Sequence, residues 1–272
     1  FIGLDEQSLL IEKKEFNQKL SNIPKAFTQH VFQSEGYTEA PGTIKFYRPL
    51  LTVSFIIDAQ FSKEGFSVFH FSNILFHFAA VIGLLFVLMR LNISPLLAFL
   101  FSLLFAVHPL LTQAIAWIPG RNDSLVCVFV LWSFYFLLKY FQAQSLKNLF
   151  LHLFLFACSL FTKENAVMLL PLSLFTLFVI HGKKLNLNKK IILAGLYLLI
   201  AAFWYYARKS AVGEIKTDLS FSTLYYSLLK NFPLVLQYFQ KTILPVNLAV
   251  MASVEDTNYG WVLLAFGLFG AG

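Results

Sequence analysis

The chain carries charged side chains directly beside long apolar runs, where charge is costly and usually marks function. The segment 108–123 starts with a histidine, ends with Arg121 and Asp123, and separates the apolar runs 95–107 and 124–141. Such side chains can bind an anion and exchange a proton. The chemistry therefore depends on which other charged residues gather at the same end of the apolar runs.

Two adjacent carboxylates, Asp5 and Glu6, follow an apolar start that looks like the end of a membrane span. Adjacent carboxylates at a membrane surface can act as a general base and as a polar clamp on a hydroxyl. The alternative interpretation is a pair of ordinary interfacial charges that flank a helix. The local sequence leaves both interpretations open.

Two further cations have neighbours that suit the binding of a phosphate. Arg48, in Tyr47-Arg48-Pro49, can bind a phosphate or carboxylate through two parallel hydrogen bonds, or it can simply extend to the membrane surface. Lys163 and Glu164 interrupt an apolar run, and the helix that follows them presents its N-terminus to an anion. Alternatively, these two side chains compensate each other's charge in a hairpin.

His70, Asn73 and His77 recur at spacings of three and four, so they share one face of a helix. That face can orient a headgroup or bind a metal. Without a carboxylate partner the metal interpretation is weak, and hydrogen bonds between helices explain the pattern more simply. We therefore assign no metal site, although a divalent metal is compatible with the chemistry.

The composition identifies the class of protein that must hold these residues. Of 272 residues, 58% are hydrophobic and 13% are charged, whereas soluble domains carry about 25% charged residues. Several apolar runs approach the roughly 20 residues that cross a bilayer. We predict an all-α integral membrane protein. The net charge of +7 comes from basic residues beside apolar runs, so we expect no nucleic-acid partner.

Polarity divides the chain into two parts. Residues 1–66 predict an outward-facing loop with short amphipathic helices, and residues 67–272 predict a transmembrane helical core. The predicted spans are 69–89, 95–107, 124–141, two short spans within 146–182 that meet at Lys163, and 189–206, with 224–244 either a span or an interfacial helix. Because the chain starts without methionine and ends inside the apolar run 261–272, we expect a span before it and others after it.

The links between the predicted spans differ in charge. Those on one side hold seven basic residues, Arg90, Lys139, Lys147, Lys183, Lys184, Lys189 and Lys190. The opposite short links hold Arg121 and Lys163. The positive-inside rule places the lysine-rich side in the cytoplasm. The candidate residues then face outward, from a bacterial inner membrane or an ER membrane.

Together, these motifs resemble the GT-C superfamily of membrane glycosyltransferases, and within it the transmembrane and tetratricopeptide-containing (TMTC-like) O-mannosyltransferases and their bacterial relatives. The motifs are Leu4-Asp5-Glu6, Tyr47-Arg48-Pro49-Leu50, His70-Phe-Ser-Asn73 with His77, His108-Pro109 through Arg121-Asn-Asp123, Lys163-Glu164-Asn165 with Pro171, and, more weakly, Leu244-Pro245-Val-Asn-Leu248. Their order and spacing cover most of the chain. The nearer relatives usually show Asp-Asp where this chain has Asp-Glu, but the protein O-mannosyltransferases also carry Asp-Glu.

The resemblance implies a multi-span GT-C-type core with a large first outward loop, embedded in membrane lipids, and a polyprenyl-phosphate sugar donor. It also implies that Asp5, with Glu6 beside it, is the catalytic base. We predict inverting transfer of mannose or a similar hexose to a hydroxyl of a protein or glycan acceptor. Lys163, Arg121 and Arg48, in that order, would hold the departing phosphate. Supporting roles fall to Asp123, Glu164, His108, His70, Asn73 and Tyr47.

Two other classes of function stay open at this point. A transporter or lipid flippase would place charges near the middle of the bilayer and would show related halves. A non-catalytic membrane scaffold would tolerate the loss of all the candidate residues. A glycosyltransferase instead requires Asp5, Arg121 and Lys163 to approach one outward cavity.

Overall fold

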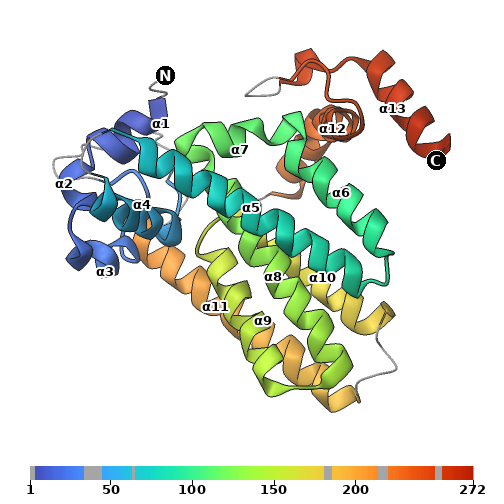
Figure 1. The fold of residues 1–272 in the computed structure, drawn as a ribbon, viewed down its shortest axis with the longest axis horizontal. Helices are drawn as coiled ribbons and strands as arrows, with labels where there is room; N and C mark the ends of the chain where they lie inside the picture. Colours follow the sequence, from blue (N-terminus) through green and yellow to red (C-terminus); the bar gives the residue numbers. More distant parts are fainter. Residues whose placement is uncertain are drawn as a thin grey trace. The chain divides into compact units, whose positions relative to one another are not determined.

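The computed structural model describes residues 4–33, 45–62, 65–180, 186–213, 220–248 and 253–271. Within those ranges the chain is helical and contains no strand, which confirms the predicted all-α class (Figure 1). Internal contacts group the chain into two units, Phe1–Ala106 with Ala114–Glu214, and Val107–Gln113 with Ile215–Gly272. The candidate residues lie in the first unit, except His108.

The N-terminal part of the first unit folds into short helices around one longer helix. These are α1 (Leu4–Glu6), η1 (Gln7–Ile11), α2 (Lys14–Asn17), η2 (Leu20–Asn22), α3 (Ile23–Ala26) and α4 (Pro49–Phe61). Pro49 starts α4, at a position where its missing N–H is not needed. Leu51, Phe55 and Ile56 are almost wholly buried. The helix α4 therefore forms the core of this part of the chain.

Three described helices are long and apolar enough to cross a membrane. They are α5 (Ser67–Arg90), the run Ile118–Ala143 that joins η4 (Ile118–Gly120) to α8 (Arg121–Ala143), and α11 (Leu187–Val212). The predicted spans 69–89, 124–141 and 189–206 lie in these helices.

The predicted span 95–107 forms α6 (Pro95–Val107), which has 13 residues and is too short to cross a bilayer by itself. The helix ends before Pro109, because proline lacks an N–H and the residue that precedes it avoids the helical conformation. The backbone of His108 is accordingly extended. A fourth span results if α6 and the helix that follows Pro109 count as one broken span.

The predicted break at Lys163 is present. The helix α9 (Leu146–Leu160) ends before it, and Lys163 itself has an extended backbone. The elements that follow are η5 (Glu164–Met168), α10 (Leu169–Phe175) and η6 (Thr176–Ile180). The apolar run therefore divides into separate short helices, as its excessive length for one span required.

The helix α8 lies at the centre of the first unit, where it packs against both α5 and α9 (Figure 1). A buried polar network also joins α8, α9 and α11. His152 Nε2 lies 2.6 Å from Tyr197 Oη, and His152 Nδ1 lies 2.8 Å from Ser133 Oγ. Hydrogen bonds between helices help to fix helix packing inside a membrane, where apolar burial does not distinguish protein from lipid.

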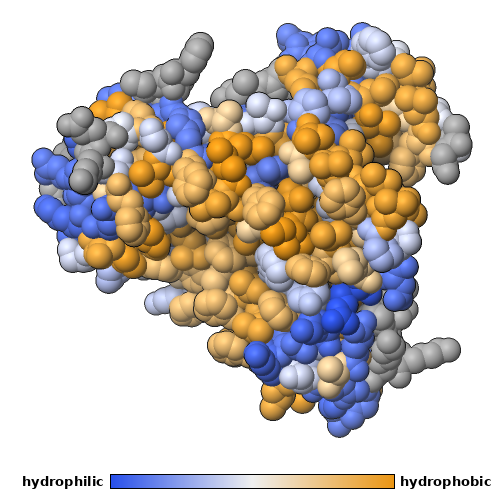
Figure 2. Space-filling view, in the orientation of Figure 1, coloured by the Kyte–Doolittle hydropathy of each residue, from blue (hydrophilic) through white to orange (hydrophobic). Residues whose placement is uncertain are grey.

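The surface of the first unit has an apolar band between two hydrophilic ends (Figure 2). One hydrophilic end covers the N-terminal helices, and the other lies where α8 ends and α11 begins. Many large apolar side chains of the long helices are exposed, including Phe71 and Phe78 of α5 and Leu199 of α11. Exposed side chains of this kind suit contact with lipid.

The second unit contains α12 (Phe221–Ile243), η7 (Val254–Asp256) and α13 (Tyr259–Ala271). The rings of Phe239 and Phe266 stack with their centroids 4.4 Å apart and join α12 to α13. Among the described helices, α12 is not one of those apolar enough to span a membrane. This favours the interfacial interpretation of the predicted segment 224–244.

Gly83 allows the close packing of α5 on α8, and its replacement tests this contact. A Cβ atom at Gly83 would lie 3.1 Å from Trp132 Nε1 and 3.2 Å from Leu131 Cβ. We expect Gly83→Leu to lower the free energy of unfolding by about 1–3 kcal/mol, because overpacking forces the helices apart. Gly195→Leu on α11 is the control, since no atom lies within 4 Å of its Cβ position. Equal losses of thermal stability in detergent would contradict this account of the interface.

Candidate active site

The candidate site lies at the N-terminal end of α8. Lys163, between α9 and η5, donates from Nζ to Asp123 in the first turn of α8. Their side chains are 18% and 53% exposed, so an ion from solution or from the membrane surface can reach this pair. Two of the predicted site residues, 40 positions apart, therefore meet.

A second ion pair joins the same region to the start of α4. Arg48 Nη2 lies 3.3 Å from Glu164 Oε2, and the Arg48 guanidinium packs over the ring of Phe46. The backbone strengthens this connection, because Leu50 N donates to Phe161 O at 3.1 Å. Lys163 and Glu164 thus each pair with a residue of another segment. The alternative interpretation, in which these two side chains compensate each other's charge, does not describe the structure.

Tyr47 supports Arg48 from within the fold. Its side chain is fully buried, its hydroxyl donates to Phe27 O at 2.9 Å, and its ring contacts the ring of Phe161. Burial raises the pKa of Tyr47 to about 12. The hydroxyl therefore stays protonated at physiological pH and acts here as a structural hydrogen-bond donor.

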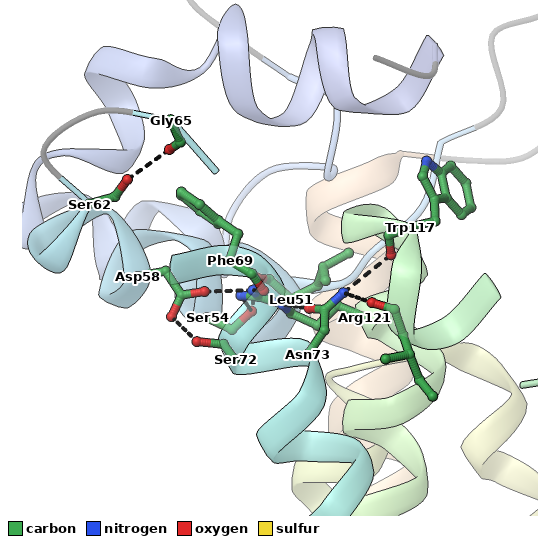
Figure 3. A network of polar contacts seen from close by, with 11 residues as sticks. Leu51, Ser54, Asp58, Ser62, Gly65, Phe69, Ser72, Asn73, Trp117 and Arg121 are labelled. Carbon is green, nitrogen blue, oxygen red and sulfur yellow. Dashed lines mark hydrogen bonds and ion pairs between the residues drawn. The ribbon is translucent and has the colours of Figure 1, made fainter. Parts of the chain in front are cut away.

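Arg121 occupies a different environment, at the centre of a closed polar network (Figure 3). Its side chain has no solvent exposure, and its Nη2 lies 2.5 Å from Asp58 Oδ2 in an ion pair. Nε donates to Asn73 Oδ1 at 2.7 Å, Nη1 to Ser54 Oγ at 3.2 Å, and Nη2 also to Phe69 O at 2.7 Å. We expected Arg121 to contact a phosphate directly. Its position does not fit this expectation, because the guanidinium is buried and its N–H groups already bind protein oxygens.

Asn73 extends this network to the segment that precedes α8. Its Nδ2 donates to Ile115 O at 3.1 Å and to Trp117 O at 3.2 Å (Figure 3). The buried amide thus holds the chain just before η4, while its oxygen binds Arg121. Asn73 serves the architecture of the site, in agreement with the hydrogen-bonding alternative for the face it shares with His70 and His77.

The three histidines lie outside these contacts. His70 is exposed on α5, and His77 Nε2 lies 3.0 Å from Ala106 O on α6. His108 belongs to the second unit, where its Nε2 lies 3.1 Å from Thr242 O. In the part of the chain that the structure describes, no three His, Cys, Asp or Glu side chains come close enough to hold a metal ion.

The adjacent carboxylates Asp5 and Glu6 lie near the start of α8. Their helix, α1, packs against η4, which leads directly into the first turn of α8 and Asp123. Glu6 is buried, whereas Asp5 is half-buried. A ligand can therefore reach Asp5 more easily than Glu6.

The sequence did not identify Asp58 as the partner of Arg121. A carboxylate inside the apolar helix 49–61 requires a compensating cation, so the sequence indicates that Asp58 has a cationic partner. The spacing of Ser54 and Asp58 also puts both on one helix face. Nothing local, however, specifies which of the distant cations supplies the charge.

Comparison with known proteins identifies the family. Residues 53–206, more than half of the chain, match the family described as dolichyl-phosphate-mannose-protein mannosyltransferase. The chain belongs to this family. The match contains the network residues and the pair of Asp123 and Lys163, and it confirms the GT-C resemblance of the sequence.

Several curated relatives are protein O-mannosyl-transferases. The chain is 33% identical to tmtc2 of Xenopus laevis over 180 residues, which cover 62% of this chain and 21% of the relative. It is 33% identical to TMTC4 of Homo sapiens over 160 residues, or 51% of this chain and 22% of the relative. The chain therefore spans about a fifth of the length of these relatives. No solved structure matches it.

The buried ion pair generates a stability prediction. Asp58→Asn should lower the free energy of unfolding by about 3–5 kcal/mol, because it leaves the Arg121 charge buried without compensation. Arg121→Met should have a comparable effect, and the double variant Asp58→Leu/Arg121→Met should recover much of the loss. Thermal unfolding of the detergent-solubilised protein measures each value.

Glu164→Gln is the matched control for that series. It breaks the partly exposed pair with Arg48, and such pairs contribute about 1 kcal/mol or less. If Asp58→Asn destabilised the protein no more than Glu164→Gln, the ion pair would not have the structural weight assigned to it.

Proposed function

We propose that this chain contains the catalytic centre of a membrane O-mannosyltransferase. In this proposal, mannose or a similar hexose passes from a polyprenyl-phosphate donor to a hydroxyl of a protein acceptor, with inversion at the anomeric carbon. Membership in a glycosyltransferase family supports the reaction type. The observation that carries the proposal is the ion pair of Lys163 with Asp123 in the first turn of α8, beside the pair of Glu164 with Arg48. The helix α1, which contains Asp5, packs against η4 just before that turn.

Asp5 is the proposed base. The acceptor oxygen forms a bond to the anomeric carbon while its proton passes to the Asp5 carboxylate. The bond between the anomeric carbon and the phosphate oxygen breaks, and its electron pair leaves with the phosphate. The half-buried position of Asp5 suits this role, because a base must be reached by its substrate and still be held in place.

Lys163 and Arg48 are the proposed partners of the departing phosphate. Negative charge grows on that phosphate in the transition state, so fixed cations stabilise the transition state more than the bound donor. Each cation already faces a carboxylate, Asp123 or Glu164, that orients it. A donor phosphate would share or displace these carboxylates, which is feasible because both pairs are partly exposed.

Arg121 takes a positioning role in this revised proposal. Its contacts with Asp58 and Asn73 hold α4, α5 and the start of α8 together. It therefore acts on the reaction by fixing the position of Asp123 and of η4, against which α1 packs. Glu6, which is buried, is proposed to orient the acceptor or its neighbour Asp5. The proposed mechanism does not require a metal ion and is compatible with one.

The charge distribution supports a non-cytoplasmic site. Arg90 Nη1 lies 2.5 Å from Gln142 Oε1, and Lys189 Nζ donates to Gln144 at the other end of α8. The basic residues that the positive-inside rule assigns to the cytoplasm thus contact the end of α8 opposite to the candidate site. We propose that the reaction occurs on the outer face of the membrane.

Replacement of the base tests the reaction. In the full-length protein, Asp5→Asn should abolish mannose transfer from a polyprenyl-phosphate donor to a serine- or threonine-containing peptide, while the unfolding temperature stays unchanged. The amide has the shape of the carboxylate but cannot accept the proton. Near-normal turnover by Asp5→Asn would refute the assignment of the base.

Replacement of the leading cation tests the phosphate contact. Lys163→Gln should lower kcat by about 100-fold or more, as removal of one group that stabilises transition-state charge does elsewhere, and Lys163→Arg should retain part of the activity. Lys147→Gln, at an exposed position near the cytoplasmic end, is the control and should have no effect. Equal activities of the Lys163 and Lys147 variants would remove Lys163 from the mechanism.

A further inference from the structure

A cavity of about 280 Å³ lies in the first unit, apart from the ion pairs described above. It opens between the helical run 7–18 on one side and the end of α4 with the start of α5 on the other. Leu10, Phe66 and Phe69 form apolar walls, and the exposed side chains of Lys14 and Gln18 lie at its rim. Figure 3 shows the ring of Phe69 directed toward Ser62 and Gly65.

The cavity is connected to the candidate site through one continuous helical run. Asp5 lies in α1 and Leu10 in η1, and α1 passes into η1 without a break. Five residues of helix advance about 7 Å. An extended polypeptide covers the same distance in two or three residues, at about 3.3 Å each.

Phe69 makes a second connection. Its ring lines the cavity, while its backbone oxygen accepts the 2.7 Å hydrogen bond from Arg121. The network that holds the start of α8 therefore also fixes one wall of the cavity. The cavity and the proposed base thus belong to one connected part of the first unit.

The lining of the cavity combines polar side chains with an apolar surface. Lys14, Asn17, Gln18 and Ser62 bring polar groups to it, and Leu10, Phe66 and Phe69 form its apolar walls. An apolar side chain gains free energy there, because its surface leaves water. The volume is near the lower limit of small-molecule sites, so it suits a single side chain, and the polar rim suits the backbone that carries it.

We propose that this cavity binds an apolar side chain of the acceptor polypeptide, two or three residues away from the hydroxyl that receives the sugar. This rests on the proposed function, because it takes Asp5 as the base for that hydroxyl. The chain would then select acceptor sites by a neighbouring leucine or phenylalanine.

A peptide series tests the proposal in the full-length protein. Each peptide contains one threonine in an alanine-rich sequence, with one leucine moved from five residues before it to five residues after it. We expect KM to fall by about tenfold, relative to the peptide without leucine, when leucine stands two or three residues from threonine. A KM that does not depend on the leucine position would overturn the proposal.

A cavity-filling variant locates the effect. Ala59 is half-buried and lines the cavity, so Ala59→Phe should remove the preference for leucine while kcat with the leucine-free peptide stays unchanged. Ala143→Phe, the same substitution at an exposed position at the far end of α8, should preserve the preference. If Ala59→Phe unfolds the protein, Ala59→Leu replaces it. A leucine preference that survives in the folded variant would contradict the cavity assignment.

Cross-linking separates this proposal from the proposed function. The probe is a peptide with photoreactive leucine at the preferred position, or three residues after the threonine if no transfer occurs. It should label Leu10, Phe66 or Phe69, and Ala59→Phe should abolish the label. Labelling without sugar transfer would support the cavity and oppose the proposed function. Transfer with labelling confined to the spanning helices, which indicates lipid-like binding, would overturn the cavity proposal alone.

Discussion

The buried ion pair between Arg121 and Asp58 is the constraint on which the rest of the site depends. A charge without solvent exposure must be compensated at short range, since its desolvation is otherwise prohibitive. Compensation here requires Asp58 from α4, Asn73 from α5 and Arg121 from α8 to meet at one point. The polar N-terminal helices and the membrane core are thereby joined in one relative position.

The charged residues proposed to act in the reaction differ from this pair in exposure and not in type. Lys163 with Asp123 and Arg48 with Glu164 are partly exposed, so each cation can change partners at little cost. Arg121 cannot, because the fold encloses it. One end of α8 thus contains a buried pair that joins the helices and partly exposed pairs beside it, a division that suits preorganised charge stabilisation.

The apolar part of the first unit serves this arrangement by keeping four helices, α5, α8, α9 and α11, in a defined packing. The network of Ser133, His152 and Tyr197 joins α8, α9 and α11, while Gly83 lets α5 approach α8. Because lipid competes with apolar side chains for contact, close approach and polar contacts decide how the helices pack. The orientation of α8 in turn determines where Asp123 meets Lys163.

The sequence by itself determined the all-α membrane class, the helix break at Lys163 and the family resemblance, because hydropathy, run length and motif order are read locally along the chain. It also indicated that Arg48, Asp123, Lys163 and Glu164 belong to one end of the spans. Only the tertiary structure decided the pairing. Lys163 binds Asp123 and not its neighbour Glu164, and Arg121 is enclosed by Asp58. Burial and partner choice arise when distant segments pack, so no local pattern contains them.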